Sequence, residues 1–157
     1  ENIFNILIHS KLVKTKIESS SVLDLYSGIG SFGIECISRG AQKVTFVEQD
    51  KSTSNVLREN LSTLSLINNS YIYHTKVESF LIKNSKNKFD IFFLDPPFTD
   101  LKFIDNLTSI KKNKIFKKNH IVIIHREKKT KDNFKNLLNI IAIKIYGRSK
   151  IIFGIFN

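Results

Sequence analysis

The chain has 157 residues, of which 41% are hydrophobic and 25% are charged. This length and composition predict one globular domain over residues 1–157 and exclude a disordered tail, a disulfide-stapled miniprotein and a collagen-like fibre. No apolar run reaches the roughly 18 residues that mark a membrane span. The net charge of +11 favours a polyanionic partner, although the abundance of Lys, Asn and Ile is also what an AT-rich genome imposes on any protein.

The cysteine content and the start of the chain bear on its cellular setting. Cys36 is the single cysteine, so no internal disulfide can form and we expect a reducing compartment, the cytoplasm. The chain begins at Glu1 without a methionine or a leader, and we interpret it as shortened at its N-terminus. The four histidines lack metal-ligand spacing, and we therefore expect no metal site.

In chain order, the first half alternates helices with strands. Apolar residues spaced by four predict a short amphipathic helix over residues 1–12. A compact apolar run at 21–26 predicts a buried strand, and Gly40 is a natural end for a helix over 31–39. The same patterns predict a strand at 43–47, a helix at 52–66, a strand at 71–74 and a helix at 77–83.

The second half continues the alternation and closes with two strands. The patterns predict strands at 89–94 and 121–124, with helices at 101–112 and 133–139. His125-Arg126-Glu127 follows a strand at the crevice side, where it could touch substrate, but we expect it to be a solvated strand end. Residues 140–146 and 150–156 form a predicted hairpin around Gly147. The predicted fold is therefore α/β: a doubly wound, Rossmann-like, mostly parallel seven-stranded sheet with a C-terminal antiparallel hairpin.

A glycine-rich sequence follows the first predicted strand. Gly28-Ile29-Gly30-Ser31-Phe32-Gly33 is a G-x-G-x-x-G whose glycines allow a tight turn and a close approach of a nucleotide-like ligand. Twenty residues after Gly28, the carboxylate of Glu48 ends the second strand and can accept hydrogen bonds from both ribose hydroxyls. The arrangement predicts an adenosine-containing cofactor, and both NAD and S-adenosylmethionine (SAM) fit at this point.

Asp24 lies within the first strand, four residues before Gly28. A buried acid is costly unless it is paired or hydrogen-bonded. Two interpretations are compatible: Asp24 receives the cationic ammonium that SAM has and NAD lacks, or it accepts hydrogen bonds from amides of the glycine loop.

Asp95-Pro96-Pro97-Phe98 favours SAM over NAD. The turn follows an apolar strand, so it lies at the carboxyl end of the sheet, where open α/β sheets bind ligands. The prolines fix the backbone and remove two donors, which leaves the Asp95 carboxylate and the Pro96 carbonyl as acceptors. Two acceptors can hold the N–H bonds of an exocyclic base amine near an electrophilic methyl, while Phe98 offers a face for stacking a flipped base.

The chain resembles the RsmD family of bacterial SAM-dependent methyltransferases, which modify a guanine N2 amine in 16S ribosomal RNA. The glycine loop and Asp95-Pro96-Pro97-Phe98 are shared by many amino-group methyltransferases. The match is narrowed by Ser38-Arg39-Gly40-Ala41 and by Glu1–Leu7, which is similar to the family's Arg-Glu-x-x-Phe-Asn-Ile-Leu helix. The resemblance covers nearly the whole chain and implies the class I SAM methyltransferase fold.

The resemblance also implies roles for individual residues. Asp24, Gly28 and Gly30 would contact the methionine end of SAM, Glu48 the ribose and Gln49 the adenine. Asp95, Pro96, Pro97 and Phe98 would hold the target amine, with Phe4 and Asn5 bordering the pocket. Lys76 stands where relatives carry Asp or Asn for the adenine amine, and Glu78 or a backbone group would substitute for it. The sequence does not include the arginine-rich segment that precedes the first helix in relatives; if the whole protein carries that segment, these residues alone would bind SAM but bind RNA weakly.

Our leading hypothesis is a monomeric, metal-independent enzyme that methylates a guanine N2 amine of 16S rRNA, free or in the 30S subunit. One alternative is an adenine-N6 methyltransferase acting on DNA or RNA, because the same turn serves both amines. Another is a catalytically silent RNA-binding assembly factor on the same fold. A NAD-dependent reductase is a weaker alternative, since nothing after Glu48 supports it.

Overall fold

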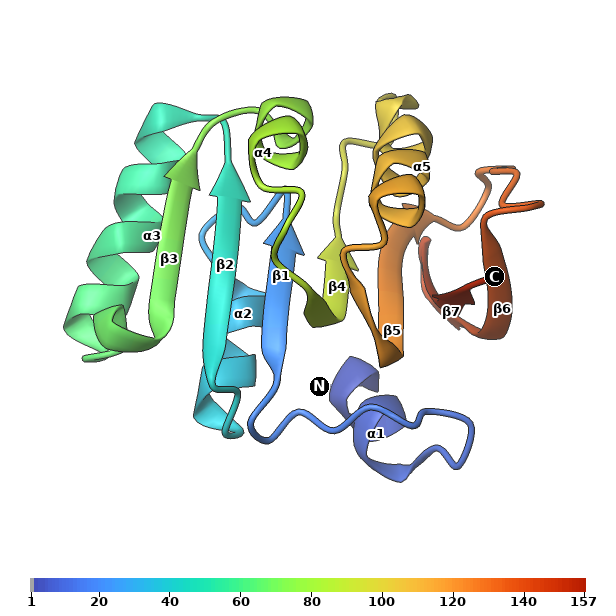
Figure 1. The fold of residues 1–157 in the computed structure, drawn as a ribbon, viewed down its shortest axis with the longest axis horizontal. Coiled ribbons are helices and arrows are strands. Elements are labelled where there is room, and N and C mark those ends of the chain that lie inside the picture. The colour runs from blue at the N-terminus through green and yellow to red at the C-terminus, as the bar shows by residue number, and fades with distance from the viewer. Residues whose placement is uncertain (1) are drawn as a thin grey trace.

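The computed structural model describes residues 2–157 and contains one seven-stranded sheet (Figure 1). The strands run in the order β3-β2-β1-β4-β5-β7-β6. Their bounds are β1 Ser21–Leu25, β2 Lys43–Glu48, β3 Ser70–His74, β4 Phe89–Leu94, β5 Phe116–Glu127, β6 Leu138–Tyr146 and β7 Ser149–Phe156. Pairs among β1 to β5 are parallel, whereas β7 pairs antiparallel with both β5 and β6. The predicted mostly parallel sheet with a C-terminal hairpin is confirmed.

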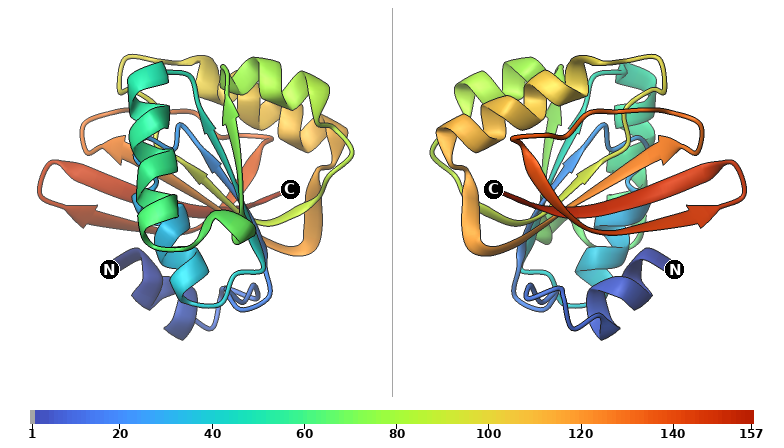
Figure 2. Two further views of the ribbon diagram at one scale, coloured as in Figure 1. Left: turned by 90° about the vertical axis from the view of Figure 1, so that its left-hand side faces the viewer. Right: turned by 90° about the vertical axis from the view of Figure 1, so that its right-hand side faces the viewer.

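Within residues 2–157, five α-helices cover the two faces of this sheet, and a short 3-10 helix, Ile67–Asn69, precedes β3 (Figure 2). The α-helices are α1 Asn2–His9, α2 Ser31–Ser38, α3 Lys51–Thr63, α4 Val77–Lys83 and α5 Lys102–Asn113. The first three helices lie on one face, and α4 and α5 lie on the other. Helices on both faces make this a doubly wound α/β fold.

Two hydrophobic clusters result from this arrangement, one on each face. Residues spaced by four supply the helical side, as Leu57 and Leu61 do on α3 and Phe103 and Leu107 do on α5. The central strands are apolar on both faces, and all five residues of β1 are buried. Burial on both faces is why strands of this kind have continuous apolar runs in the sequence.

Residues 133–139 do not form the predicted helix. The Asn133 side chain accepts a hydrogen bond from the Lys135 amide, and Asn136 adopts a φ of 63°. These contacts produce a turn, because an Asn side chain that bonds to its own backbone competes with helix formation. The chain then enters β6 at Leu138.

Several other boundaries differ from the sequence-based prediction, and the helix predicted to end at residue 66, for example, ends at Thr63. The first helix ends at His9 rather than at residue 12, and Glu1 lies outside the described residues. Strand β5 is much longer than predicted, and its pairing with β4 shifts register after Phe89. The extension carries β5 past its apolar centre to His125, Arg126 and Glu127 at the carboxyl edge.

The strand order places a crevice at the carboxyl edge of the sheet. The order reverses between β1 and β4, and open α/β sheets bind ligands beyond the strand ends at such a switch point.

Among residues 2–157, none of the helices has both the length and the apolar character that spanning a membrane requires.

Candidate active site

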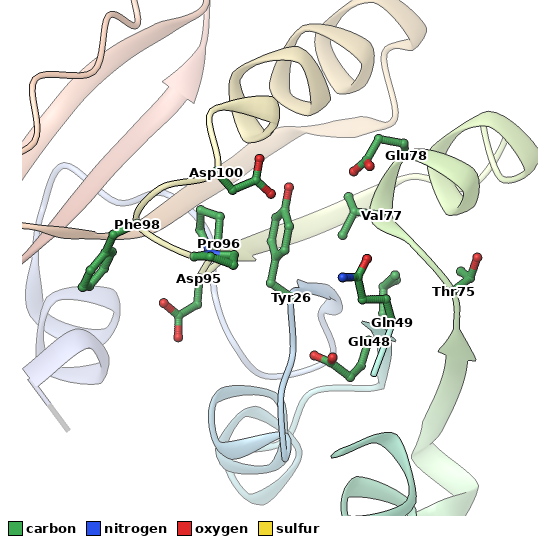
Figure 3. Close-up of a pocket in the computed structure, with 12 residues that line it drawn as sticks. Tyr26, Glu48, Gln49, Thr75, Val77, Glu78, Asp95, Pro96, Phe98 and Asp100 are labelled. Atoms are coloured by element: carbon green, nitrogen blue, oxygen red, sulfur yellow. The ribbon is translucent and has the colours of Figure 1, made fainter. Parts of the chain in front are cut away.

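A cavity of about 370 Å³ lies at this switch point (Figure 3). Its walls come from the ends of β1, β2 and β4 and from the start of α4. The lining residues are Tyr26, Val47, Glu48, Gln49, Thr75, Val77, Glu78, Asp95, Pro96, Pro97, Phe98 and Asp100. Predicted ribose, adenine and acceptor residues, which lie up to 50 positions apart in the sequence, therefore share one cavity.

The glycine loop connects β1 to α2 beside this cavity. Gly30 has a φ of 91°, and a Cβ there would lie 2.3 Å from the Leu57 side chain. A Cβ on Gly33 would lie 2.3 Å from the Phe46 ring on β2. The motif therefore requires glycine at these two positions, because the loop turns with positive φ and α2 packs closely on the sheet.

Glu48 ties the end of β2 to the glycine loop. Its Oε1 accepts a hydrogen bond from the Gly28 amide and its Oε2 accepts one from the Asp50 amide, both at 2.9 Å. Each carboxylate oxygen has more than one lone pair, so the same group can also accept bonds from a pair of ribose hydroxyls. Gln49 follows it and lines the cavity.

Asp24 is 1% exposed and only half of its carboxylate is satisfied. Its Oδ2 accepts a hydrogen bond from the Gly33 amide at 3.1 Å, as one of the two interpretations predicts. Its Oδ1 has no partner among the described residues, and the buried Ser27 Oγ is likewise unpartnered there. Burial, reinforced by the nearby Asp95 and Glu48 carboxylates, raises the pKa of Asp24 well above its usual range. A cation beside Oδ1 would relieve this cost, so the site fits an ammonium.

The Asp95–Phe98 turn begins where β4 ends. Asp95 Oδ1 lies 2.7 Å from His125 Nδ1, and the Phe98 ring is 38% exposed. In the part of the chain that the structure describes, no group donates to Asp95 Oδ2 or to the Pro96 carbonyl. The two predicted acceptors are thus available to a ligand.

The cavity is acidic although the protein is strongly basic. Four carboxylates line it, those of Glu48, Glu78, Asp95 and Asp100, and no Lys or Arg is among the described lining residues. Glu78 is held in place by Asn106, whose Nδ2 donates to Glu78 Oε2 at 3.0 Å and to the Tyr26 hydroxyl at 2.7 Å. Burial raises the pKa of Tyr26 well above its usual value, so this hydroxyl stays protonated.

A second cavity of about 440 Å³ adjoins the first and shares Tyr26 and Asp95 with it. Its other lining residues are Ile3, Ser27, Gly28, Ile29, Ser31, Phe32 and Phe93. The first helix therefore reaches the site through Ile3. Phe4 is 5% exposed and stacks on Phe32 at 5.3 Å, while Asn5 is exposed, and neither lines either of these two cavities.

Arg126 contradicts the expectation of a solvated strand end. Its side chain is fully buried and ion-paired with Asp132, and it donates hydrogen bonds to the turn that contains Pro97 and Phe98. Sequence reasoning also missed Tyr26, Ser27, Asn106 and a contact of His125 with Asp95. Tyr26 and Ser27 directly precede the glycine motif and could have been included, whereas Asn106 gives no signal in the sequence. No group of three potential metal-ligating side chains occurs within residues 2–157.

Residues 1–155 match the model of a family described as Conserved hypothetical protein 95. The chain belongs to this family. It is 35% identical over 114 residues to Ribosomal RNA small subunit methyltransferase D of Haemophilus influenzae, and 34% identical over 113 residues to the protein of the same name from Buchnera aphidicola. These alignments cover 71% and 72% of this chain but 59% of each relative. The resemblance to the RsmD family is confirmed.

Solved structures of other proteins share the fold. One from Haemophilus influenzae has a TM-score of 0.82 at 29% identity, covering 98% of this chain and 95% of that one. A ribosomal protein L11 methylase from Lactobacillus delbrueckii has a TM-score of 0.75 at 16% identity, covering 99% and 76% of the two chains. A structure described as "a putative methyltransferase complexed with SAH" (S-adenosylhomocysteine) has a TM-score of 0.71 at 13% identity. The match covers 96% of this chain and 49% of that one. The class I SAM methyltransferase fold is confirmed.

Proposed function

We propose that the protein transfers a methyl group from SAM to the N2 amine of a guanine in small-subunit rRNA. The observation that carries this proposal is that one cavity holds both Glu48, suited to a ribose, and the Asp95–Phe98 turn, suited to an exocyclic amine. The names of the Haemophilus and Buchnera relatives support rRNA as the substrate class.

The charge of the cavity supports SAM over a dinucleotide. SAM carries a sulfonium and an ammonium against one carboxylate, so its net charge is positive, whereas the pyrophosphate of NAD is negative. Four carboxylates without a lining Lys or Arg would repel a pyrophosphate and attract a cation. The half-satisfied carboxylate of Asp24 gives the ammonium a specific partner.

The proposal assigns a part of SAM to each of the following residues. Asp24 and the glycine loop bind the amino-acid end of SAM, Glu48 binds the ribose, and Gln49 and Glu78 lie where the adenine is expected. Glu78 keeps one carboxylate oxygen for the adenine amine, because Asn106 binds the other. This arrangement provides an acceptor that Lys76 cannot supply. When bound there, SAM supplies an electrophilic methyl group.

The turn acts on the acceptor amine. Asp95 Oδ2 and the Pro96 carbonyl accept its two N–H bonds and fix the direction of its lone pair, and Phe98 stacks on the base. Asp95 needs no raised basicity, because the nitrogen becomes strongly acidic once it carries the methyl group. Its proton then passes to Asp95 or to water.

The proposed partner is small-subunit rRNA, free or within a 30S particle in the cytoplasm. The proposed enzyme is a monomer that needs no metal ion. An adenine-N6 amine in DNA or RNA is the alternative target, because the turn offers the same two acceptors to it. A silent assembly factor is the alternative without chemistry.

The test is transfer of radiolabelled methyl from SAM to unmethylated 30S subunits, to naked 16S rRNA and to duplex DNA, with SAM binding measured by calorimetry. Recovery of the label as N2-methylguanosine is the expected result. Label recovered as N6-methyladenosine would show that the target base is adenine and not guanine. SAM binding without label on any of these nucleic acids would show that the proposed substrate is wrong. Absence of SAM binding would overturn the enzyme assignment and favour the assembly factor.

A further inference from the structure

The last residues of β5 contact the Asp95–Phe98 turn from two sides. His125 Nδ1 lies 2.7 Å from Asp95 Oδ1, and its ring meets the Phe98 ring edge-on at 5.7 Å. Since neighbouring residues of a strand point to opposite faces, Arg126 approaches from the other side. It places its guanidinium 3.5 Å from the Pro97 carbonyl and 3.2 Å from the Phe98 carbonyl.

Arg126 is held firmly enough to act as a support. Its Nε and Nη2 donate to both oxygens of Asp132, at 2.8 and 3.3 Å, and its guanidinium lies 4.5 Å from the centre of the Phe103 ring. Arg126 is 0% exposed and the Asp132 side chain 5%. A buried guanidinium is tolerated only when its donors are largely satisfied, and the turn carbonyls accept two of the four hydrogen bonds that Arg126 donates.

The composition of the turn explains why it needs such support. Pro96 and Pro97 lack an N–H, so neighbouring acceptors cannot hold the turn by its amides. The amide of Asp95 makes only a long contact of 3.5 Å to the Leu25 carbonyl. The turn is therefore fixed mainly by donors directed at its carbonyl and carboxylate oxygens; β5 provides three such contacts, and the Asp100 amide adds one to the Pro97 carbonyl.

These contacts also divide the acceptors of the turn. His125 occupies Asp95 Oδ1 and leaves Oδ2, while Arg126 occupies the Pro97 and Phe98 carbonyls and leaves that of Pro96. The two oxygens left over are those assigned above to the target amine. We propose that His125 and Arg126 are positioning residues that hold the turn in its amine-accepting geometry. This inference rests on the proposed function.

The kinetic test uses Arg126→Lys, His125→Ala and His125→Asn. A displacement of about 1 Å at the acceptor can cost about 100-fold in rate, so we expect kcat to fall about 10- to 100-fold in Arg126→Lys and about tenfold in His125→Ala. His125→Asn keeps an N–H donor and should regain part of that loss. Because neither residue lines the cavity, the KM for SAM should stay within about twofold in all three variants.

Arg39→Lys is the matched control for Arg126→Lys. Arg39 likewise pairs with a carboxylate, Glu35 at 2.7 Å, and lies 4.7 Å from the centre of the Phe4 ring, but it does not contact the turn. Its kcat should remain that of the unmodified protein. Equal losses in both variants, or a rise in the KM for SAM with unchanged kcat, would overturn the inference.

A second measurement does not depend on catalysis. The Asp100 amide donates to the Pro97 carbonyl at 2.9 Å, so its hydrogen exchange reports on the turn. We expect Arg126→Lys to accelerate this exchange at least about tenfold, while the exchange of the Thr53 amide, which is bonded to Asp50, stays unchanged.

If the unmodified protein methylates nothing, the proposed function fails and this exchange alone decides whether β5 holds the turn. Unchanged exchange in Arg126→Lys would overturn the inference while leaving the function intact. If Arg126→Lys does not fold, the His125 variants decide it, since that side chain is 26% exposed.

Discussion

The two halves of the chain differ in charge although they build one sheet. Residues 1–78 contain eight Lys and Arg against eight Asp and Glu, whereas residues 79–157 contain 17 against six. The entire net charge of +11 therefore resides in the half that begins within α4 and carries the Asp95–Phe98 turn. The cavity between the halves is nevertheless acidic on both sides, with Glu48 and Glu78 from the first and Asp95 and Asp100 from the second.

This difference indicates how one protein can bind two ligands of opposite charge. A cation is favoured within the cavity, and a polyanion is favoured on the surface around it. The segment after β5 exposes Lys128, Lys129 and Lys131, and it lies at the same end of the sheet as the Asp95–Phe98 turn (Figure 1). The basic half would therefore bring nucleic acid to the edge of the cavity, while the neutral half would hold the cofactor.

The largest effect that separates the halves is expected at Asp95. Asp95→Ala removes an acceptor for the amine, and we expect kcat for methyl transfer to fall at least about 1000-fold while the Kd for SAM changes less than about threefold. Single-turnover methyl transfer and calorimetry measure the two quantities. Asp105→Ala on the exposed face of α5 is the control. Unchanged turnover in Asp95→Ala would remove the catalytic assignment.

The next effect belongs to the first half. Glu48→Gln replaces one acceptor oxygen with a donor that faces the Asp50 amide, and it weakens the proposed ribose contact. We expect the Kd for SAM to rise about 10- to 100-fold, or about 1.4–2.8 kcal/mol, with kcat at saturation changed little. Calorimetric titration checks this against Glu59→Gln, an exposed acid on α3. An unaltered Kd would place the ribose elsewhere.

A smaller effect tests the basic half directly. Replacing Lys128, Lys129 and Lys131 together with Ala should weaken RNA binding about tenfold at low salt and reduce the slope of log K against log salt by about two. Filter binding at several salt concentrations measures both. The control removes the same number of charges from the first half, at Lys43, Lys51 and Arg58. Equal losses in the two triple variants would mean that the charge asymmetry does not guide RNA.

The smallest effect concerns stability and a histidine outside the site. His120 donates through Nδ1 to the Lys117 carbonyl and accepts from the Phe156 amide at Nε2, and its burial lowers its pKa below the usual 6.5. The unfolded chain therefore takes up this proton first as the pH falls. His120 thus contributes stability that is present above about pH 6.5 and lost as the pH falls through the lowered native value. Melting temperatures between pH 8 and 5 should fall less in His120→Gln than in the unmodified protein; parallel curves would exclude this linkage.

The sequence was sufficient wherever a residue's role depends on its near neighbours. The strand at Phe89–Leu94 and the helix at Val77–Lys83 have the predicted bounds, since apolar periodicity and glycine or proline boundaries are local signals. The sequence likewise predicted that the glycine loop and Glu48 lie side by side, because strand, turn, helix and acid follow one another at fixed spacing, and the Gly28 amide donates to Glu48 Oε1. Local signals failed where Asn133 and Asn136 formed a turn in place of a predicted helix.

Tertiary structure decided what the sequence could not, namely which distant groups meet at the carboxyl edge. Arg126 belongs to a polar run that a sequence predicts to be solvated, yet Asp132 and two carbonyls 28 and 29 residues away satisfy it in the interior. Asn106 gains its role only because α5 packs beside Tyr26 and Glu78. A buried charge is stable only with partners, and partners supplied by other elements are set by the packing of the whole fold rather than by sequence spacing.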